Sequence, residues 1–238
     1  MLLYILFALL SCGIEEYYYL PQDVDIRKEL NTAAVLEIEP ITERYATGFT
    51  IFYRIYITNA FLSGVEINTE NLMRDISASL FNDFRDLTPF ADPANNTSIT
   101  TENTFKNRNY HELELEGIDI KTVFKTTGGT FRINFQDRAG TEPFLSYDDA
   151  GTERVYFLLR NNGGGVFTPE PEDRYFFYTP ELTSTETDVN NDVIRRSDNA
   201  DGYAYVSMYI VAIGQNPDTF QRILSKPTHI NIFKLPDN

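Results

Sequence analysis

The sequence of 238 residues contains one cysteine, two histidines and no tryptophan. A single cysteine excludes a disulfide within the chain, and so few Cys and His residues argue against a structural zinc site. The G-x-S-x-G, P-loop and G-x-G-x-x-G motifs are also missing. The chain therefore shows no signature of serine hydrolases, NTPases or dinucleotide-binding enzymes. These absences predict a protein that is not an enzyme and that uses no cofactor or metal.

The two histidines, His111 and His229, both fall within predicted strands. A histidine pair joined by a carboxylate would form a catalytic or metal site. Two unrelated strand histidines are the simpler interpretation, because neither residue belongs to a motif.

Positive charge is also scarce. The chain has 20 Lys and Arg residues against 35 Asp and Glu residues, which gives a net charge of −15. Nucleic-acid binding needs a basic surface, so the charge argues against a nucleic-acid partner. It argues equally against docking onto anionic lipids by charge alone. An acidic surface of this kind keeps an exported domain soluble.

Long hydrophobic runs are absent, and the run at residues 2–10 is the one continuous apolar stretch near the N-terminus. A membrane-spanning helix needs about 20 apolar residues, so this run is too short to span. Its length is that of the apolar core of a signal peptide. The run leads into Leu9-Leu10-Ser11-Cys12, which contains the only cysteine of the chain.

The residues Leu9-Leu10-Ser11-Cys12 resemble the lipobox of bacterial lipoproteins, and Leu10 resembles the looser lipobox of spirochaetes. The resemblance implies that the Cys12 thiol carries a diacylglyceryl group and that a peptidase removes residues 1–11. Two or more acyl chains would make attachment to a membrane long-lived. No Lys or Arg precedes Cys12, a departure from the usual signal peptide. The alternative is a buried N-terminal strand whose cysteine packs as a small hydrophobe.

The composition after Cys12 predicts a tether followed by a β-rich domain. Residues 12–30 are expected to form the lipidated tether, which includes Tyr17-Tyr18-Tyr19, and residues 31–238 the domain. Tyr and Phe number 15 and 18, and aromatic residues favour strands. Residues 49–58 alternate between an apolar and a mixed face, which is typical of a sheet with one face in a core. Residues 203–213 are apolar on both faces, which predicts a central strand.

Further elements follow from shorter patterns. Residues 33–39, 111–120, 154–160, 174–178 and 229–235 are predicted strands, and Gly128-Gly129 predicts a hairpin over residues 122–134. Residues 69–88 have apolar side chains at spacings of three and four, which predicts an amphipathic helix covering an edge or an end of a sheet. The pattern predicts an all-β fold, mainly an antiparallel β-sandwich with one inserted α-helix.

Three segments resemble strands of fibronectin type III and related immunoglobulin-like domains. Residues 48–54 resemble the third strand, residues 203–212 the sixth, and Ser225-Lys226-Pro227-Thr228 leads into the last. The first two segments are further apart than such a domain requires. The resemblance therefore implies a large insertion, or a second subdomain, at about residues 61–200.

The whole chain also resembles an uncharacterised family of treponemal lipoproteins. The resemblance is carried by the segment from Leu10 to Pro21, by Phe52-Tyr53-Arg54-Ile55-Tyr56 and by Ser225-Lys226-Pro227-Thr228. It implies an exported protein held at a membrane of the cell envelope, and it carries no reaction.

Two patterns of acidic residues offer alternatives. Paired carboxylates at Asp148-Asp149 and at Glu170 and Glu172 would suit glycoside hydrolysis, although pairs arise by chance among 35 acidic residues. A second set of Asp and Asn residues offers oxygen ligands for Ca²⁺. However, Val193 stands where a calcium-binding loop requires glycine, and the Glu that would complete the loop is missing. The pattern therefore favours a solvated polar loop. This second set consists of Asp188, Asn190, Asp192, Asp198, Asn199 and Asp201.

The sequence predicts a lipid-anchored envelope lipoprotein that acts as a binding or structural β-module, on the periplasmic face or at the cell surface. Its partners are the membrane, through acyl chains on Cys12, and a protein or glycan ligand. A secreted glycan hydrolase and a calcium-stabilised adhesin are the alternatives.

Overall fold

The structure, a computed structural model, describes the chain in several stretches. They are Leu20 and residues 24–29, 32–58, 110–136, 142–161, 175–176, 193–195, 203–218, 220, 222–225 and 227–236. Cys12, the triple tyrosine and the predicted helix at residues 69–88 lie outside the described residues.

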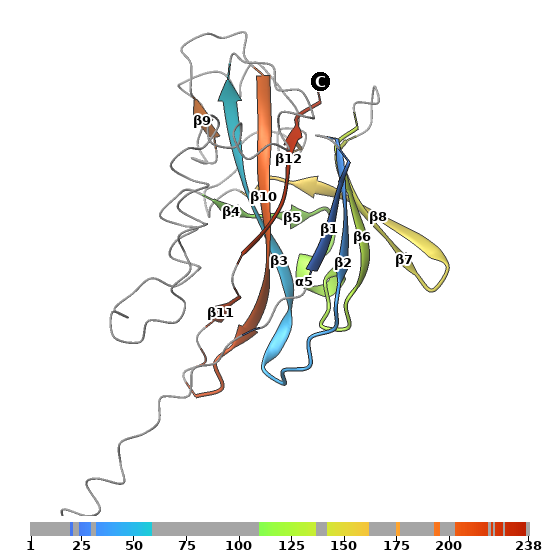
Figure 1. The fold of residues 1–238 in the computed structure, drawn as a ribbon, viewed down its shortest axis with the longest axis vertical. Helices are drawn as coiled ribbons and strands as arrows, with labels where there is room; N and C mark the ends of the chain where they lie inside the picture. Colours follow the sequence, from blue (N-terminus) through green and yellow to red (C-terminus); the bar gives the residue numbers. More distant parts are fainter. Residues whose placement is uncertain are drawn as a thin grey trace, which may run out of the picture.

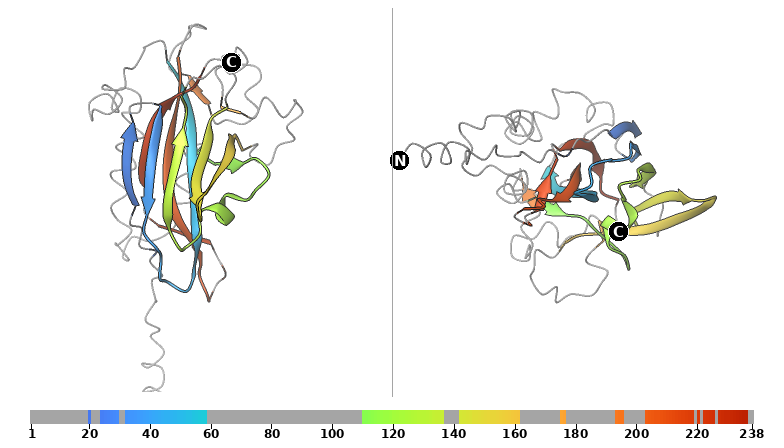
Figure 2. Two further views of the ribbon diagram at one scale, coloured as in Figure 1. Left: turned by 90° about the vertical axis from the view of Figure 1, so that its right-hand side faces the viewer. Right: turned by 90° about the horizontal axis from the view of Figure 1, so that it is seen from below.

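The fold is mostly antiparallel β, with two sheets, one of them a half-barrel, and a single short helix in the part described (Figure 1). This confirms the predicted fold class. In the left view of Figure 2, the strands of both sheets run along the long axis of the molecule, and the strands of one sheet lie in front of those of the other. The first sheet has the order β1 (Val24–Glu29), β2 (Ala33–Ile38), β6 (Gly129–Asn134), β7 (Phe144–Asp149), β8 (Thr152–Leu159) and β5 (Glu114–Leu115).

The second sheet is built around two strands of 13 residues each. All of its pairings are antiparallel except that of β9 with β3. It has the order β11 (Arg222–Leu224), β10 (Tyr203–Gln215), β3 (Ala46–Thr58) and β4 (His111–Glu112), with β12 (Thr228–Lys234) also on β10 and β9 (Val193–Arg195) on β3.

Strands β3 and β10 form the centre of this sheet. They pair continuously from Thr58↔Tyr203 to Ala46↔Gly214, with one irregularity near Ile213. Side chains on alternate sides of β10, such as Ser207 and Met208, are all buried from residue 204 to residue 213. The prediction of a central strand buried on both faces is confirmed.

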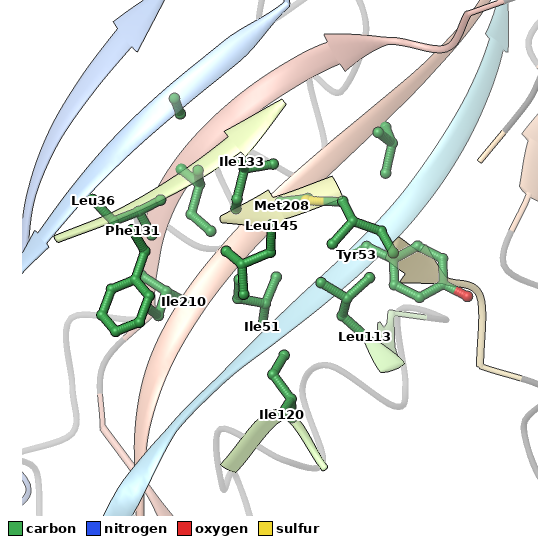
Figure 3. Close-up of a cluster of buried hydrophobic side chains, with 14 of the residues drawn as sticks. Leu36, Ile51, Tyr53, Leu113, Ile120, Phe131, Ile133, Leu145, Met208 and Ile210 are labelled. Atoms are coloured by element: carbon green, nitrogen blue, oxygen red, sulfur yellow. The ribbon is translucent and has the colours of Figure 1, made fainter. Parts of the chain in front are cut away.

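The core lies between the two sheets. Figure 3 shows side chains of the first sheet, including Leu36 and Ile133, opposite Ile51 and Ile210 of the second sheet. The predicted inward face of residues 49–58 is confirmed by the burial of its described members, which are Phe49, Ile51, Tyr53 and Ile55.

The predicted strand at residues 111–120 divides into two short pieces. Its apolar residues Leu113 and Leu115 are buried as expected. However, β4 pairs with β3 in the second sheet, whereas β5 pairs with β8 in the first. The chain crosses from one sheet to the other at Leu113, whose N–H donates to the carbonyl oxygen of Ile51 at 2.7 Å.

The predicted hairpin at residues 122–134 is wrong. Residues before the glycines form the short helix α5 (Ile120–Val123), and β6 pairs with β2 and β7 instead. The Asp119 carboxylate accepts a hydrogen bond from the Lys121 N–H at 2.9 Å and so caps the first turn. Ile120 and Val123 then share one buried face at a spacing of three residues.

Strands of the described fold lie within two ranges that the sequence analysis predicted to be a tether and an insertion. Strand β1 lies within the range 12–30 expected to be tether, because Val24 and Ile26 alternate with exposed residues and pack against the core. Strands β5 to β8 lie within the expected insertion at residues 61–200, yet they supply four of the six strands of the first sheet. These strands are part of the sandwich itself.

Gly128 and Gly117 provide a matched test of the packing between the helix region and β2. Both have φ near +70°, at +71° and +73° respectively. A Cβ at Gly128 would overlap the Ile38 carbonyl oxygen, whereas a Cβ at Gly117 would meet nothing within 4 Å. We expect Gly117→Ala to cost about 1 kcal/mol of unfolding free energy through backbone strain alone. Gly128→Ala should cost about 2 kcal/mol more, because the added methyl group would overlap the Ile38 carbonyl oxygen, a backbone atom that cannot move aside as a flexible side chain can.

Urea unfolding of both variants measures this difference. Equal losses of unfolding free energy would contradict the close approach of Gly128 to β2.

Candidate functional site

The structure separates the two histidines. His111 lies in β4 and His229 in β12, as the predicted strands required. Strands β3 and β10 lie between them in the sheet. At a strand spacing of about 4.8 Å, the two residues are about 14 Å apart. They do not form a shared site.

The most developed polar cluster surrounds His229. The Lys28 Nζ lies 3.3 Å from His229 Nδ1, and the Ser207 Oγ lies 3.5 Å from His229 Nε2. The ring of Tyr209 packs against the imidazole, with centroids 4.9 Å apart. Three strands supply these groups: β1 gives Lys28, β10 gives Ser207 and Tyr209, and β12 gives His229.

A serine beside a histidine suggests a nucleophile and its base. However, the third group here is the Lys28 ammonium, whose charge is opposite to that of the carboxylate in a catalytic triad. In a catalytic triad a carboxylate accepts the Nδ1 proton, which leaves Nε2 free to take the serine proton. The charged ammonium of Lys28 offers only donors. The His229 Nδ1 must therefore accept, and Nε2 carries the proton and donates to Ser207.

This direction of donation prevents His229 from activating Ser207 as a nucleophile. The electrostatics agree with the geometry. Burial, and to a smaller extent the charge of Lys28, hold the pKa of His229 well below its usual value of 6.5. Although much of the Lys28 side chain is exposed, removal of its ammonium from water lowers its own pKa. The cluster therefore holds a neutral imidazole as a structural link between strands.

An aromatic layer continues from this cluster across the second sheet. Tyr209 meets Tyr110 edge to face at 5.6 Å, and the Arg54 guanidinium lies 5.9 Å from the centroid of the Tyr110 ring. Burial, followed by the neighbouring Tyr110, raises the pKa of Tyr209 well above 10. Tyr209 is therefore a neutral donor and packing group at physiological pH.

Sequence reasoning missed Lys28, Ser207 and Tyr209. Lys28 is 201 residues from His229 in the chain, and no local pattern marks that contact. Only the pairing of β10 with β12 would have indicated that Tyr209 stands opposite His229.

The described members of the paired carboxylates are turn residues. The Asp148 carboxylate accepts from the Gly151 N–H at 2.6 Å, and Asp149 pairs with Arg154 at 3.5 Å. Both lie at the exposed end of the β7–β8 hairpin, which projects from the body of the molecule in Figure 1. They bind their own turn rather than line a groove. Glu170, Glu172 and the six candidate calcium ligands lie outside the described residues.

A cavity of about 330 Å³ lies where β4 and β5 pass beside α5. Two of its carboxylates already make structural hydrogen bonds. Glu112 accepts hydrogen bonds from both terminal guanidinium nitrogens of Arg222, at 2.8 and 3.0 Å, and Asp119 caps the helix. The cavity thus presents no nucleophile with an adjacent base. Its lining consists of Glu112, Leu113, Glu114, Leu115, Ile118, Asp119, Ile120, Lys121 and Asn161.

The described residues contain no cluster of three or more His, Cys, Asp or Glu residues that would hold a metal ion. In the same part of the chain, no helix has both the length and the apolar character to cross a bilayer.

Comparisons with known proteins complete the description of the site. The sequence matches no protein-family model, and no curated protein or solved structure matches it.

The neutral His229 gives a testable pH dependence. Because its pKa is lowered in the folded state, the unfolded chain binds more protons below about pH 6.5. The unfolding free energy should therefore fall as the pH drops from about 7.5 to about 5.5, by at most about 1.4 kcal/mol per pH unit. Chemical denaturation at a series of pH values measures this slope.

His229→Gln should remove the slope, and His111→Gln should retain it. A slope that persists in His229→Gln would show that the protonation arises elsewhere.

Proposed function

We propose that the protein is a lipid-anchored module of the bacterial cell envelope, held at a membrane by acyl chains on Cys12, and that it binds a partner or supports the envelope without catalysis. The observation that carries the proposal is the position of the single cysteine. Cys12 directly follows the apolar run, and the described fold starts eight residues later at the buried Leu20. That spacing suits an anchor joined to a separate folded domain.

The chemistry of the described residues supports a non-catalytic role. Because the Lys28 ammonium beside His229 Nδ1 can only donate, we assign the imidazole proton to Nε2, which faces Ser207. Asp148 and Asp149 are engaged in a turn. The β-sandwich offers its surface and loops for binding, which is how domains of this architecture usually recognise partners.

Two resemblances in the sequence also favour the proposal. The segment from Leu10 to Pro21 resembles that of treponemal lipoproteins, and residues 48–54 and 203–212 resemble strands of fibronectin type III domains. Domains of the latter kind are common extracellular binding modules. The ligand expected for such a surface is a protein or a glycan.

Substitution of the cysteine tests the anchor. Cys12→Ser should abolish incorporation of radioactive palmitate and move the protein from the membrane fraction to the soluble fraction, because the thiol is the attachment point. Globomycin, which blocks the lipoprotein signal peptidase, should cause a larger precursor of the native protein to accumulate.

Ser11→Ala is the matched control, since it keeps a small residue before the cysteine and should leave labelling and fractionation unchanged. The anchor is excluded if Cys12→Ser partitions with membranes as the native protein does.

A further inference from the structure

The position of Leu20 identifies the end of the sandwich at which the N-terminal segment joins the fold. Leu20 is only 2% exposed. Its two Cδ atoms lie 3.2 and 3.3 Å from where a Cβ of Gly214 would be, and the Tyr45 carbonyl oxygen lies 2.6 Å from the same point. The Gln215 N–H donates to that carbonyl at 3.0 Å. Leu20 is therefore packed where β10 ends and β3 begins.

We call this part of the molecule the Leu20 end; its described residues are 39–45, 125–128, 214–218 and 220. The Ile41 N–H donates to the Thr126 carbonyl oxygen at 2.8 Å, which joins the first two segments. In Figure 1 the end of β10 and strand β11 lie at the opposite end of the molecule from the C-terminus. Leu20 and the C-terminus therefore lie at opposite ends of the sandwich.

Phe220 is the unusual residue of the Leu20 end. Its side chain is 72% exposed, more than that of Val155, the other exposed large apolar side chain of the described residues. Its φ is +57°, in the left-handed region that bulky side chains rarely adopt. A large aromatic side chain is thus presented to solvent by a strained backbone, a combination that points to function.

Hydrogen bonds fix the turn that presents Phe220. The Phe220 N–H donates to the Asn216 carbonyl at 2.8 Å, and the Gln215 side-chain amide donates to the Phe220 carbonyl at 3.0 Å. The Asn216 carboxamide oxygen also accepts from the Asp218 N–H at 2.8 Å. Beyond the turn, the bidentate pair of Arg222 with Glu112 holds the start of β11. The hydrogen-bonded turn therefore holds the Phe220 ring in its exposed position.

We infer that the turn at residues 216–220 is a membrane contact, and that Phe220 inserts among the phospholipids of the bilayer to which Cys12 is anchored. The inference rests on the proposed function. Leu20 is eight positions after Cys12, and an extended chain of eight steps spans at most about 29 Å. The anchor therefore restricts the distance between the bilayer and the Leu20 end.

The charge at the Leu20 end is compatible with this contact. Although the chain has a net charge of −15, residues of this end contribute three carboxylates and two basic side chains. The described residues of this end thus carry a net charge of −1. An apolar ring at a nearly neutral surface gains free energy when it is buried at the headgroup–acyl boundary. The charged residues of the Leu20 end are Glu39, Glu43, Asp218, Arg44 and Lys125.

The absence of tryptophan from the chain allows a direct test. Phe220→Trp introduces a single indole at the proposed contact. The acylated full-length variant is reconstituted into phosphatidylcholine vesicles and separated by flotation. We expect a blue shift of its emission, and loss of emission when the acyl chains of the lipid carry bromine.

Val155→Trp is the matched control. Val155 is 48% exposed and lies in β8, on the hairpin that projects away from β11 in Figure 1. Its indole should remain accessible to acrylamide and insensitive to brominated lipid. Emission from Trp at position 155 that responds equally to brominated lipid would overturn the inference, because the contact would then not be specific to the Leu20 end.

The remaining outcomes separate the inference from the proposed function. Failure of the native protein to float with vesicles would overturn both. Flotation of Phe220→Trp with unquenched, acrylamide-accessible emission would overturn the membrane contact alone. A blue shift without quenching by brominated lipid would also overturn it, since the ring would then be covered by protein.

Discussion

The pairing of β3 with β10 is the constraint on which the rest of the structure depends. These two strands share a register from residue 46 to residue 58, and β4, β9, β11 and β12 attach on either side of them. Inward side chains of the pair, among them Ile51 and Ile210, form one wall of the core. The outward side supports Ser207 and Tyr209, and therefore the His229 cluster. A slip of one residue would exchange these two sets of side chains.

Polar groups in this protein are used to connect strands. Lys28 joins β1 to β12 through His229, Arg132 binds Glu29 across the first sheet, and Thr50 and Arg222 both bind Glu112. Each contact joins a donor to an acceptor on a different strand. These pairs therefore link strands that are far apart in the sequence.

The sequence predicted the strands in which hydrophobic alternation is strong. Residues 49–58 were identified because the core selects their side chains at every second position, and residues 203–213 because both of their faces are apolar. Strand β11 has three residues and β1 is half exposed, so neither shows a strong alternation of apolar and polar residues. The hairpin error at residues 122–134 arose because Gly128 serves a close approach to β2 rather than a two-residue turn. The His229 cluster was not predictable, since its members meet only through long-range pairing.

The sequence separation between β3 and β10 has a consequence for the order of folding. Residues 46–58 cannot acquire their main partner until residues 203–215 have been synthesised. Contacts between distant segments make folding slow, because a large loop must close before they form. The second sheet is therefore completed late, when most of the chain has left the ribosome.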